Sequence, residues 1–227
     1  EAGILPRLDL LLWRKEQSKD FRRGRFHVIK AIYEIILDNP ENKKSICNKS
    51  LIDILLSCLI KSKGDFESSQ VVLSLLRIVV ANDYERQKDF RDLGGFNVFI
   101  SLLKNQKNEM FINSLLLGIN YLLESSVKNR RSFHKSGGSK VLISFLKNPE
   151  SQVWLQEKSL SLLSLLLERN LERQKYILEN SFDEIVSFYE KASLSLKVSL
   201  EDALAPLGVE PFATEKKRKK GRRYVEF

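Results

Sequence analysis

A stretch of twenty residues occurs twice in this sequence, and the repetition restricts the possible folds more than any other feature. RQKDFRDLGGFNVFISLLKN at 86–105 returns as NRRSFHKSGGSKVLISFLKN at 129–148, with an offset of 43 residues and nine identical positions. Internal similarity at a period of about 40–45 residues is typical of helical repeat proteins, in which each repeat packs only against its neighbours. The stretch is therefore either one repeated structural unit or one binding site present twice.

The repeat extends beyond these two copies in both directions. NKKSICNKSLIDILLSCLIK at 42–61 aligns upstream, and RQKYILENSFDEIVSFYEK at 173–191 aligns downstream with Tyr176 at the place of Phe133. A long apolar segment precedes each of the four copies, with apolar residues at positions i, i+3, i+4 and i+7, as on one face of a helix. No segment alternates apolar and polar residues as a strand does. The sequence predicts an all-helical protein.

The ends of the predicted helices carry residues that favour caps and turns. Asn82-Asp83, Ser125-Ser126 and Asn170 follow the long apolar helices. The pairs Gly94-Gly95 and Gly137-Gly138 permit a tight, left-handed turn before the next helix. We interpret these glycines as turn residues; the two outer copies lack them.

In this order of elements the sequence resembles the armadillo repeat. That family's unit of about 42 residues has a long helix ending near an Asn, a short helix, a Gly-Gly pair and a third helix. In INYLLESSVKNRRSFHKSGGSKVLISFL, Asn120 lies near the expected Asn, Asn129-Arg130 begins the short helix and Gly137-Gly138 precedes the third. EAGILPRLDLLL at 1–12 looks like the third helix of a preceding repeat. HEAT repeats, the nearest alternative, usually have two helices and a proline-marked kink.

The resemblance covers residues 1 to about 208. It implies a right-handed α-solenoid of about four armadillo-like repeats, with partial or capping helices at both ends. The expected domains are an armadillo-like helical repeat domain at 1–212 and a basic C-terminal tail at 213–227.

Alignment of the repeats places a serine at one position of the third helix in all four copies, six residues after the second glycine. A small residue there either lets neighbouring third helices approach closely or lies on a concave inner face that binds an extended peptide or a partner helix. Both interpretations stay open. If the serines line a concave inner face, the groove residues are Ser57, Asn97, Ser101, Lys104, Asn105, Lys140, Ser144, Lys147, Asn148 and Ser187.

The net charge of +9 is concentrated at the two ends of the chain. Residues 31–212 hold 23 basic and 23 acidic side chains, whereas the tail is strongly basic through Lys216, Lys217, Arg218, Lys219, Lys220, Arg222 and Arg223. Such a run of basic residues is typical of a nuclear-localisation segment that contacts an importin. It also suits binding to an acidic protein, a nucleic acid or an anionic surface, or a role in solubility alone.

Catalytic, metal and cofactor motifs are absent. The chain has two histidines and two cysteines, with no C-x-x-C, H-E-x-x-H, G-x-S-x-G or phosphate-binding loop. We therefore expect no enzyme activity, no metal and no cofactor. No stretch approaches the roughly 20 apolar residues of a membrane span, and Cys47 and Cys58 are expected to be reduced thiols, which suits the cytoplasm, the nucleus or both.

The predicted function is a noncatalytic scaffold or adaptor that binds a protein partner, as an extended peptide or a helix, in the groove of the third helices. One alternative is a nucleic-acid or anionic-surface binding module that uses the basic ends. Another follows from resemblance: NRRSFHKSGGSKVLISFLK followed by a leucine-rich helix is similar to small armadillo-like cofactors that hold a kinase in fungal septation signalling. The Trp and Asn array with which nuclear-import armadillo proteins bind lysine-rich peptides is missing from the repeat register.

Overall fold

The computed structural model describes residues 19–61, 66–148, 150–167 and 171–189, together with 194, 197–198 and 201. All regular secondary structure in these residues is helical, so the all-α prediction is confirmed. The chain divides into two compact units, with unit 1 ending at Ser125 and unit 2 beginning at Ser126. The predicted N-terminal helix at 1–12 and the basic tail at 213–227 lie outside the described residues.

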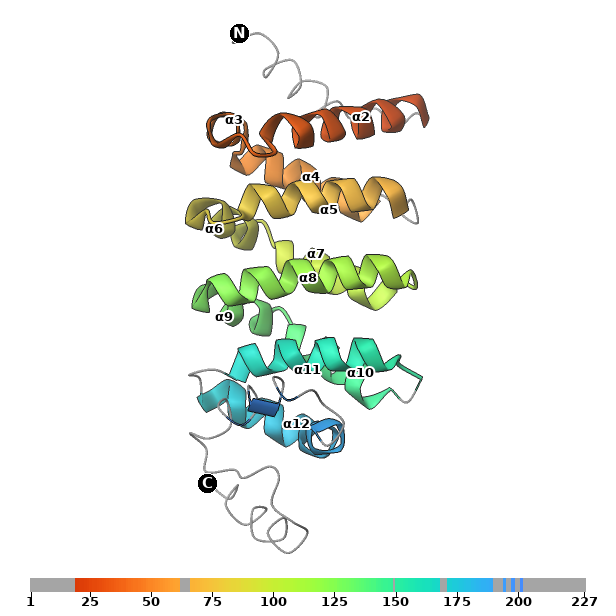
Figure 1. Cartoon of the computed structure of the whole chain (residues 1–227), viewed down its shortest axis with the longest axis vertical. Coiled ribbons are helices and arrows are strands. Elements are labelled where there is room, and N and C mark those ends of the chain that lie inside the picture. Colours follow the sequence, from red (N-terminus) through yellow and green to blue (C-terminus); the bar gives the residue numbers. More distant parts are fainter. Residues whose placement is uncertain are drawn as a thin grey trace, which may run out of the picture. The chain divides into compact units, whose positions relative to one another are not determined.

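The helices follow the predicted cycle of long, short and third helix. Unit 1 contains α2 (Lys19–Ile36), α3 (Pro40–Ile46), α4 (Lys49–Lys61), α5 (Phe66–Val80), α6 (Tyr84–Asp92), α7 (Gly95–Asn105) and α8 (Glu109–Ser125). Unit 2 contains α9 (Val127–Lys135), α10 (Gly138–Lys147), α11 (Val153–Leu167) and α12 (Leu171–Tyr189). Within unit 1 the long helix α5 packs between the long helices α2 and α8 (Figure 1). None of the described helices is both long and apolar enough to cross a bilayer.

The turns from α2 to α3 and from α5 to α6 each contain one left-handed residue followed by one cap residue. Asp38 and Asn82 have φ of 56° and 54°, and both are residue types that tolerate this conformation. The next residues, Asn39 and Asp83, accept the N–H three residues later at 2.9 and 3.0 Å. These side chains satisfy backbone groups that the start of a helix leaves open.

The short helices also hold the ends of the long helices through a recurring hydrogen bond. A side chain near the start of the short helix donates to the carbonyl seven residues earlier. The pairs are Asn42 to Ile35 at 3.0 Å, Gln87 to Val80 at 3.2 Å, Arg173 to Leu166 at 2.7 Å and Gln174 to Leu167 at 2.7 Å. The last carbonyls of a helix have no intrahelical partner, so these bonds stabilise the turn.

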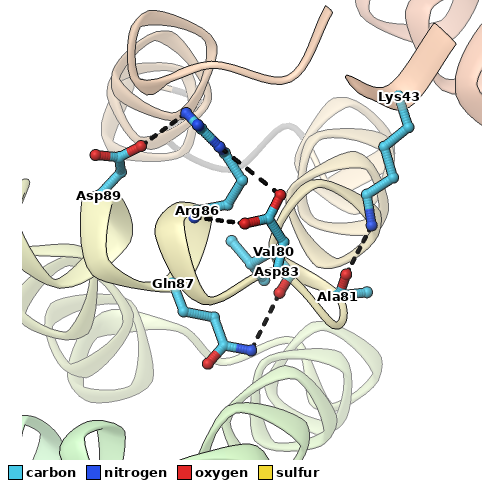
Figure 2. A network of polar contacts seen from close by, with 7 residues as sticks. All are labelled: Lys43, Val80, Ala81, Asp83, Arg86, Gln87 and Asp89. Atoms are coloured by element: carbon cyan, nitrogen blue, oxygen red, sulfur yellow. Dashed lines mark hydrogen bonds and ion pairs between the residues drawn. The ribbon is translucent and has the colours of Figure 1, made fainter. Parts of the chain in front are cut away.

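Figure 2 shows this arrangement between α5 and α6. Gln87 reaches back to the Val80 carbonyl, and Lys43 Nζ of the preceding short helix donates to the Ala81 carbonyl at 2.7 Å. Arg86 Nη1 forms an ion pair with Asp89 Oδ2 at 2.8 Å within α6. The Lys43 bond therefore joins successive repeats within unit 1.

The apolar faces of the third helices form much of the core. Phe99, Leu103, Leu142 and Leu146 are buried. Val98, Leu102 and Phe145, which are also apolar residues of these helices, are only partly buried. Cys47 is buried and Cys58 is partly buried, and neither forms a disulfide.

The register of the last copy differs from the prediction by one residue. Ile177, not Tyr176, holds the fully buried place of Phe133. The turn after it is shorter, because α12 continues through a kink at Ser181, with φ of −152°, where the middle copies have a left-handed glycine. Ser181 is buried, and its hydroxyl donates to the Ile177 carbonyl at 2.6 Å.

Candidate functional site

The glycine pairs set the start of each middle third helix. Gly94 and Gly137 have φ of 72° and 90°, in the left-handed region that side chains disfavour. Gly95 and Gly138 are right-handed, but a Cβ on either would overlap the ring of Phe90 or Phe133. The first glycine therefore makes the turn and the second lets the new helix lie against the buried phenylalanine. The turn role is thus confirmed for Gly94 and Gly137, whereas Gly95 and Gly138 are the first residues of α7 and α10.

In unit 1 the exposed side of α7 carries a polar stripe. Asn97, Ser101, Lys104 and Asn105 are all exposed and lie at i, i+4, i+7 and i+8, on one side of the helix. The Asn105 side chain donates to the Ser101 carbonyl at 2.7 Å, which caps the end of its own helix. Three side chains of the stripe thus remain available to a partner.

The neighbouring helix α4 packs against α7 and presents the same register positions. They are Asp53, Ser57, Ile60 and Lys61. Ser57 and Asp53 are partly buried, whereas Ile60 is 57% exposed. Sequence reasoning missed Ile60, although the offset of 44 to Lys104 would have identified it as a surface position. Unit 1 thus places an exposed apolar side chain beside hydroxyl, amide and ammonium groups.

In unit 2 the equivalent stripe lies on α10 and the second part of α12. Lys140, Ser144, Lys147 and Asn148 are exposed on and just after α10, and Ser187 is exposed on α12. The two helices pack together. The Ser144 hydroxyl donates to the Val141 carbonyl at 2.7 Å.

The charges of the two stripes are mixed, with an excess of lysine on α10. Lys147 Nζ lies 3.8 Å from Glu184 Oε1 of α12, at the outer limit of an ion pair, and both side chains are accessible to water. Such a pair contributes little stability and leaves Lys147 able to exchange partners. Lys140 has the exposed Asp183 as its counterpart on α12 in the repeat register.

The structure brings the ten predicted groove residues onto two stripes, five residues in each unit. Ser101, Ser144 and Ser187 are exposed and Ser57 is partly buried. A serine that allowed close helix packing would be covered by the neighbouring helix, so the exposed serines are surface residues within their own units. The seven predicted tail residues lie outside the described part of the chain.

One histidine and one serine of unit 2 are in hydrogen-bond contact. His134 Nδ1 and Ser139 Oγ are 2.8 Å apart, and burial together with the Arg173 charge lowers the pKa of His134, an effect that Glu172 partly opposes. Ser139 is only 1% exposed, so its hydroxyl is not accessible to a substrate. No group of three or more His, Cys, Asp or Glu side chains suited to a metal ion occurs among the described residues.

Comparisons with known proteins identify the fold but no relative. No protein-family model and no curated protein matches the sequence. Among solved structures, an engineered protein superposes with a TM-score of 0.68 at 15% identity, over 98% of this chain and 95% of its own. A designed armadillo repeat protein superposes with a TM-score of 0.64 at 14% identity, over 98% of each chain. Another, solved in complex with the peptide (KR)4, gives 0.62 at 13% identity, also over 98% of each.

These similarities establish the fold class. The chain is an all-α solenoid of armadillo-like repeats, as the repeat period and the glycine turns predict.

Proposed function

We propose that the chain is a noncatalytic protein-binding scaffold whose third-helix stripes hold an extended peptide or a helix of a partner. The observation that carries the proposal is the recurrence of exposed serine, asparagine and lysine side chains on helices whose other sides are buried. Solenoid repeats commonly bind partners along such repeated surfaces. The fold similarity to designed armadillo repeat proteins, one of them in complex with a peptide, supports this type of function.

The composition of the stripes indicates the chemistry of the partner segment. The side chains of Lys104, Lys140 and Lys147 donate hydrogen bonds and carry positive charge. A lysine- and arginine-rich peptide would be repelled by them, so the preferred segment carries carboxylates or neutral acceptors. In unit 1, Ile60 adds an apolar contact for a side chain of that segment.

The test is affinity capture from cell lysate with the wild type and the double variant Ser101→Arg/Ser144→Arg. The added side chains are large enough to block both stripes, and they lie at exposed positions, so circular dichroism should stay helical. Proteins that bind the stripes should be captured by the wild type and lost from the double variant. Capture that is unchanged by the double variant would sink the proposal.

A matched control adds the same two charges elsewhere on the surface. Ser45→Arg/Met110→Arg changes two exposed positions outside the stripes and should leave capture unchanged. A kinase among the proteins lost only from the stripe variant would support the resemblance to kinase-holding cofactors. A general loss in both variants would indicate a charge effect instead of groove binding.

We also propose the basic tail at 213–227 as a second contact, with an acidic protein, an importin or a nucleic acid. Removal of these residues should weaken that contact without affecting binding to the stripes. Comparing the nuclear and cytoplasmic distribution of the tagged whole chain with that of the truncated chain tests the localisation role. An unchanged distribution together with unchanged partner affinity would exclude both roles for the tail.

A further inference from the structure

The short helices present a second repeated surface, separate from the third-helix stripes. On α6, α9 and α12, three exposed positions at i, i+3 and i+7 lie on the same side of the helix. They are Glu85, Lys88 and Asp92 on α6, Lys128, Arg131 and Lys135 on α9, and Glu172, Lys175 and Glu179 on α12. The shorter helix α3 carries only the first two of these positions, Glu41 and Lys44.

The charges at these positions single out α9. On α6 and α12 a base lies between two acids, so each side holds its own opposite charges. On α9 all three residues are basic, and the whole helix, VKNRRSFHK, contains no acid. We name Lys128, Arg131 and Lys135 the α9 basic face; it places three positive charges within about 10 Å along the helix axis.

Among the described residues of unit 2, no ion pair neutralises this charge. No carboxylate of the described part of unit 2 forms an ion pair with Lys128, Arg131 or Lys135. The positive field extends to α12, where burial and the charges of Arg130 and Arg131 lower the pKa of Arg173. Opposite charge brought by a partner would therefore be stabilised there without displacing an internal ion pair.

The surroundings of α9 favour a protein partner over a nucleic acid. Proteins that bind single strands stack bases on exposed aromatic rings. On α9, Phe133 is completely buried and the His134 ring packs edge-on against Tyr176 at 5.3 Å. Val127, at the start of the helix, is 63% exposed and offers an apolar contact to a peptide.

The acidic residues of α12 also favour a protein partner over a nucleic acid. Glu172 and Glu179 are exposed in the same unit. A polyanion that extended from α9 towards α12 would meet their negative charge, whereas a short acidic segment confined to α9 would not. Carboxylates at positions i, i+4 and i+7 of a partner helix, or at alternate residues of an extended strand about 6.6 Å apart, can each meet a cation of the α9 basic face.

We propose that the α9 basic face is a docking site for a short acidic segment of a protein partner. It lies on a different helix from the Ser101 and Ser144 stripes, so a partner can be held by both surfaces or by one alone.

The experiment measures binding of a fluorescein-labelled oligoglutamate peptide to the full chain by fluorescence anisotropy at low salt. Lys128→Glu/Arg131→Glu/Lys135→Glu should weaken binding by about tenfold or more. The control Lys30→Glu/Lys44→Glu/Lys88→Glu changes three exposed bases of unit 1 and alters the net charge equally. It should weaken binding by about twofold or less, since only long-range charge is lost. The basic tail is present in the wild type and in both triple variants, so it contributes equally to peptide binding in all three proteins.

Three results would overturn the proposal. Equal losses in the two triple variants would show that the peptide responds to total charge and not to α9. A single-stranded oligothymidine of the same charge that binds more tightly than the peptide, and loses affinity with the α9 variant, would make the surface a nucleic-acid site. Where the charge-reversal variant loses helical circular dichroism, Lys128→Ala/Arg131→Ala/Lys135→Ala replaces it, with an expected loss of about threefold or more. A smaller loss in that variant, with the helix content retained, contradicts the proposal.

Discussion

The copies at 86–105 and 129–148 surround the phenylalanine that each buries in different ways. In the first copy the Phe90 ring packs edge-on against Phe96 and Phe99, with ring centroids 5.1 and 5.2 Å apart. Such edge-to-face pairs stabilise a core beyond the area that they bury. The first copy is thus held by a cluster of three aromatic rings.

In the second copy the two ring positions next to Phe133 are Ser139 and Leu142. Ser139 is buried, and its hydroxyl is in hydrogen-bond contact with His134, whose ring packs against Tyr176. A polar contact and a ring from the following repeat thus take the place of the aromatic cluster. Both arrangements support the same backbone turn.

The comparison shows which parts of a repeat are constrained. The left-handed glycine, the second glycine and the buried ring recur because together they fix the angle between the short and third helices. The residues around them vary, and the outer side of the short helix varies most, from mixed charges on α6 to basic ones alone on α9. The fold is common to both copies and the surface is specific to each.

The largest expected effect comes from removing the buried rings. Phe90→Ala and Phe133→Ala should each lower the free energy of unfolding by about 3–5 kcal/mol, because a large cavity is left. Phe90→Ala should cost about 1 kcal/mol more, since it also removes two aromatic pairs. Urea unfolding followed by circular dichroism measures both. Equal costs, or a greater cost at Phe133, would contradict the proposed role of the aromatic cluster.

The next largest effect is expected at the second glycine of each pair. Gly95→Ala and Gly138→Ala should each destabilise the protein by about 1–3 kcal/mol, because the added methyl group overlaps a buried ring. Thermal unfolding measures the loss. In a Phe133→Leu background the Gly138→Ala loss should be smaller, since leucine leaves more room beside the turn.

The exposed Gly24 on α2 provides the control. A Cβ there meets no atom within 4 Å, so Gly24→Ala should stabilise the helix by about 0.5–1 kcal/mol. A loss at Gly24 as large as that at Gly138 would show that the helix starts are not sterically limited.

Much of the fold follows from the sequence because its signals are local and repeated. The Gly94-Gly95 turn and the periodic leucines specify helix, turn and buried face without knowledge of distant contacts. The one-residue shift that buries Ile177 was not predictable in this way, because Tyr176 and Ile177 are both apolar enough for the core and the absence of a glycine removed the marker of the register.

The surfaces were less predictable for a different reason. Exposure of a third-helix serine depends on how neighbouring helices cover it, and an alignment of repeats cannot give that. The sequence contained the signal for α9, since VKNRRSFHK lacks an acid, but only the structure shows that Lys128, Arg131 and Lys135 share an exposed side. Ile60 was missed because its own side chain is apolar, although its repeat equivalent Lys104 is polar.

A smaller effect is expected at the first glycine of each pair, and it separates conformation from packing. Gly94→Ala and Gly137→Ala should each cost about 1–2 kcal/mol, because alanine is disfavoured in the left-handed region and no severe overlap arises. Gly94→Asn and Gly137→Asn should cost less, since asparagine tolerates that conformation, as Asn82 does in the native chain. Thermal unfolding of the four variants checks the order. Asparagine variants no more stable than the alanine ones would refute this explanation.

The smallest expected effect is a dependence on pH that belongs to the second copy alone. His134 occupies the position of Arg91 in the first copy, and burial, with the nearby Arg173, lowers the pKa of His134 in the folded chain. Between the two pKa values the folded state binds fewer protons than the unfolded state. The contribution of neutral His134 to stability is therefore complete above the unfolded-state pKa of about 6.5, and it is lost as the pH falls through the folded-state pKa. Melting temperatures measured from neutral to mildly acidic pH should fall further in the wild type than in His134→Gln.

The exposed His27 is the matched control site, and His27→Gln should retain the pH dependence of the wild type. If His134→Gln retained it as well, protonation of this partly buried ring would not be its cause.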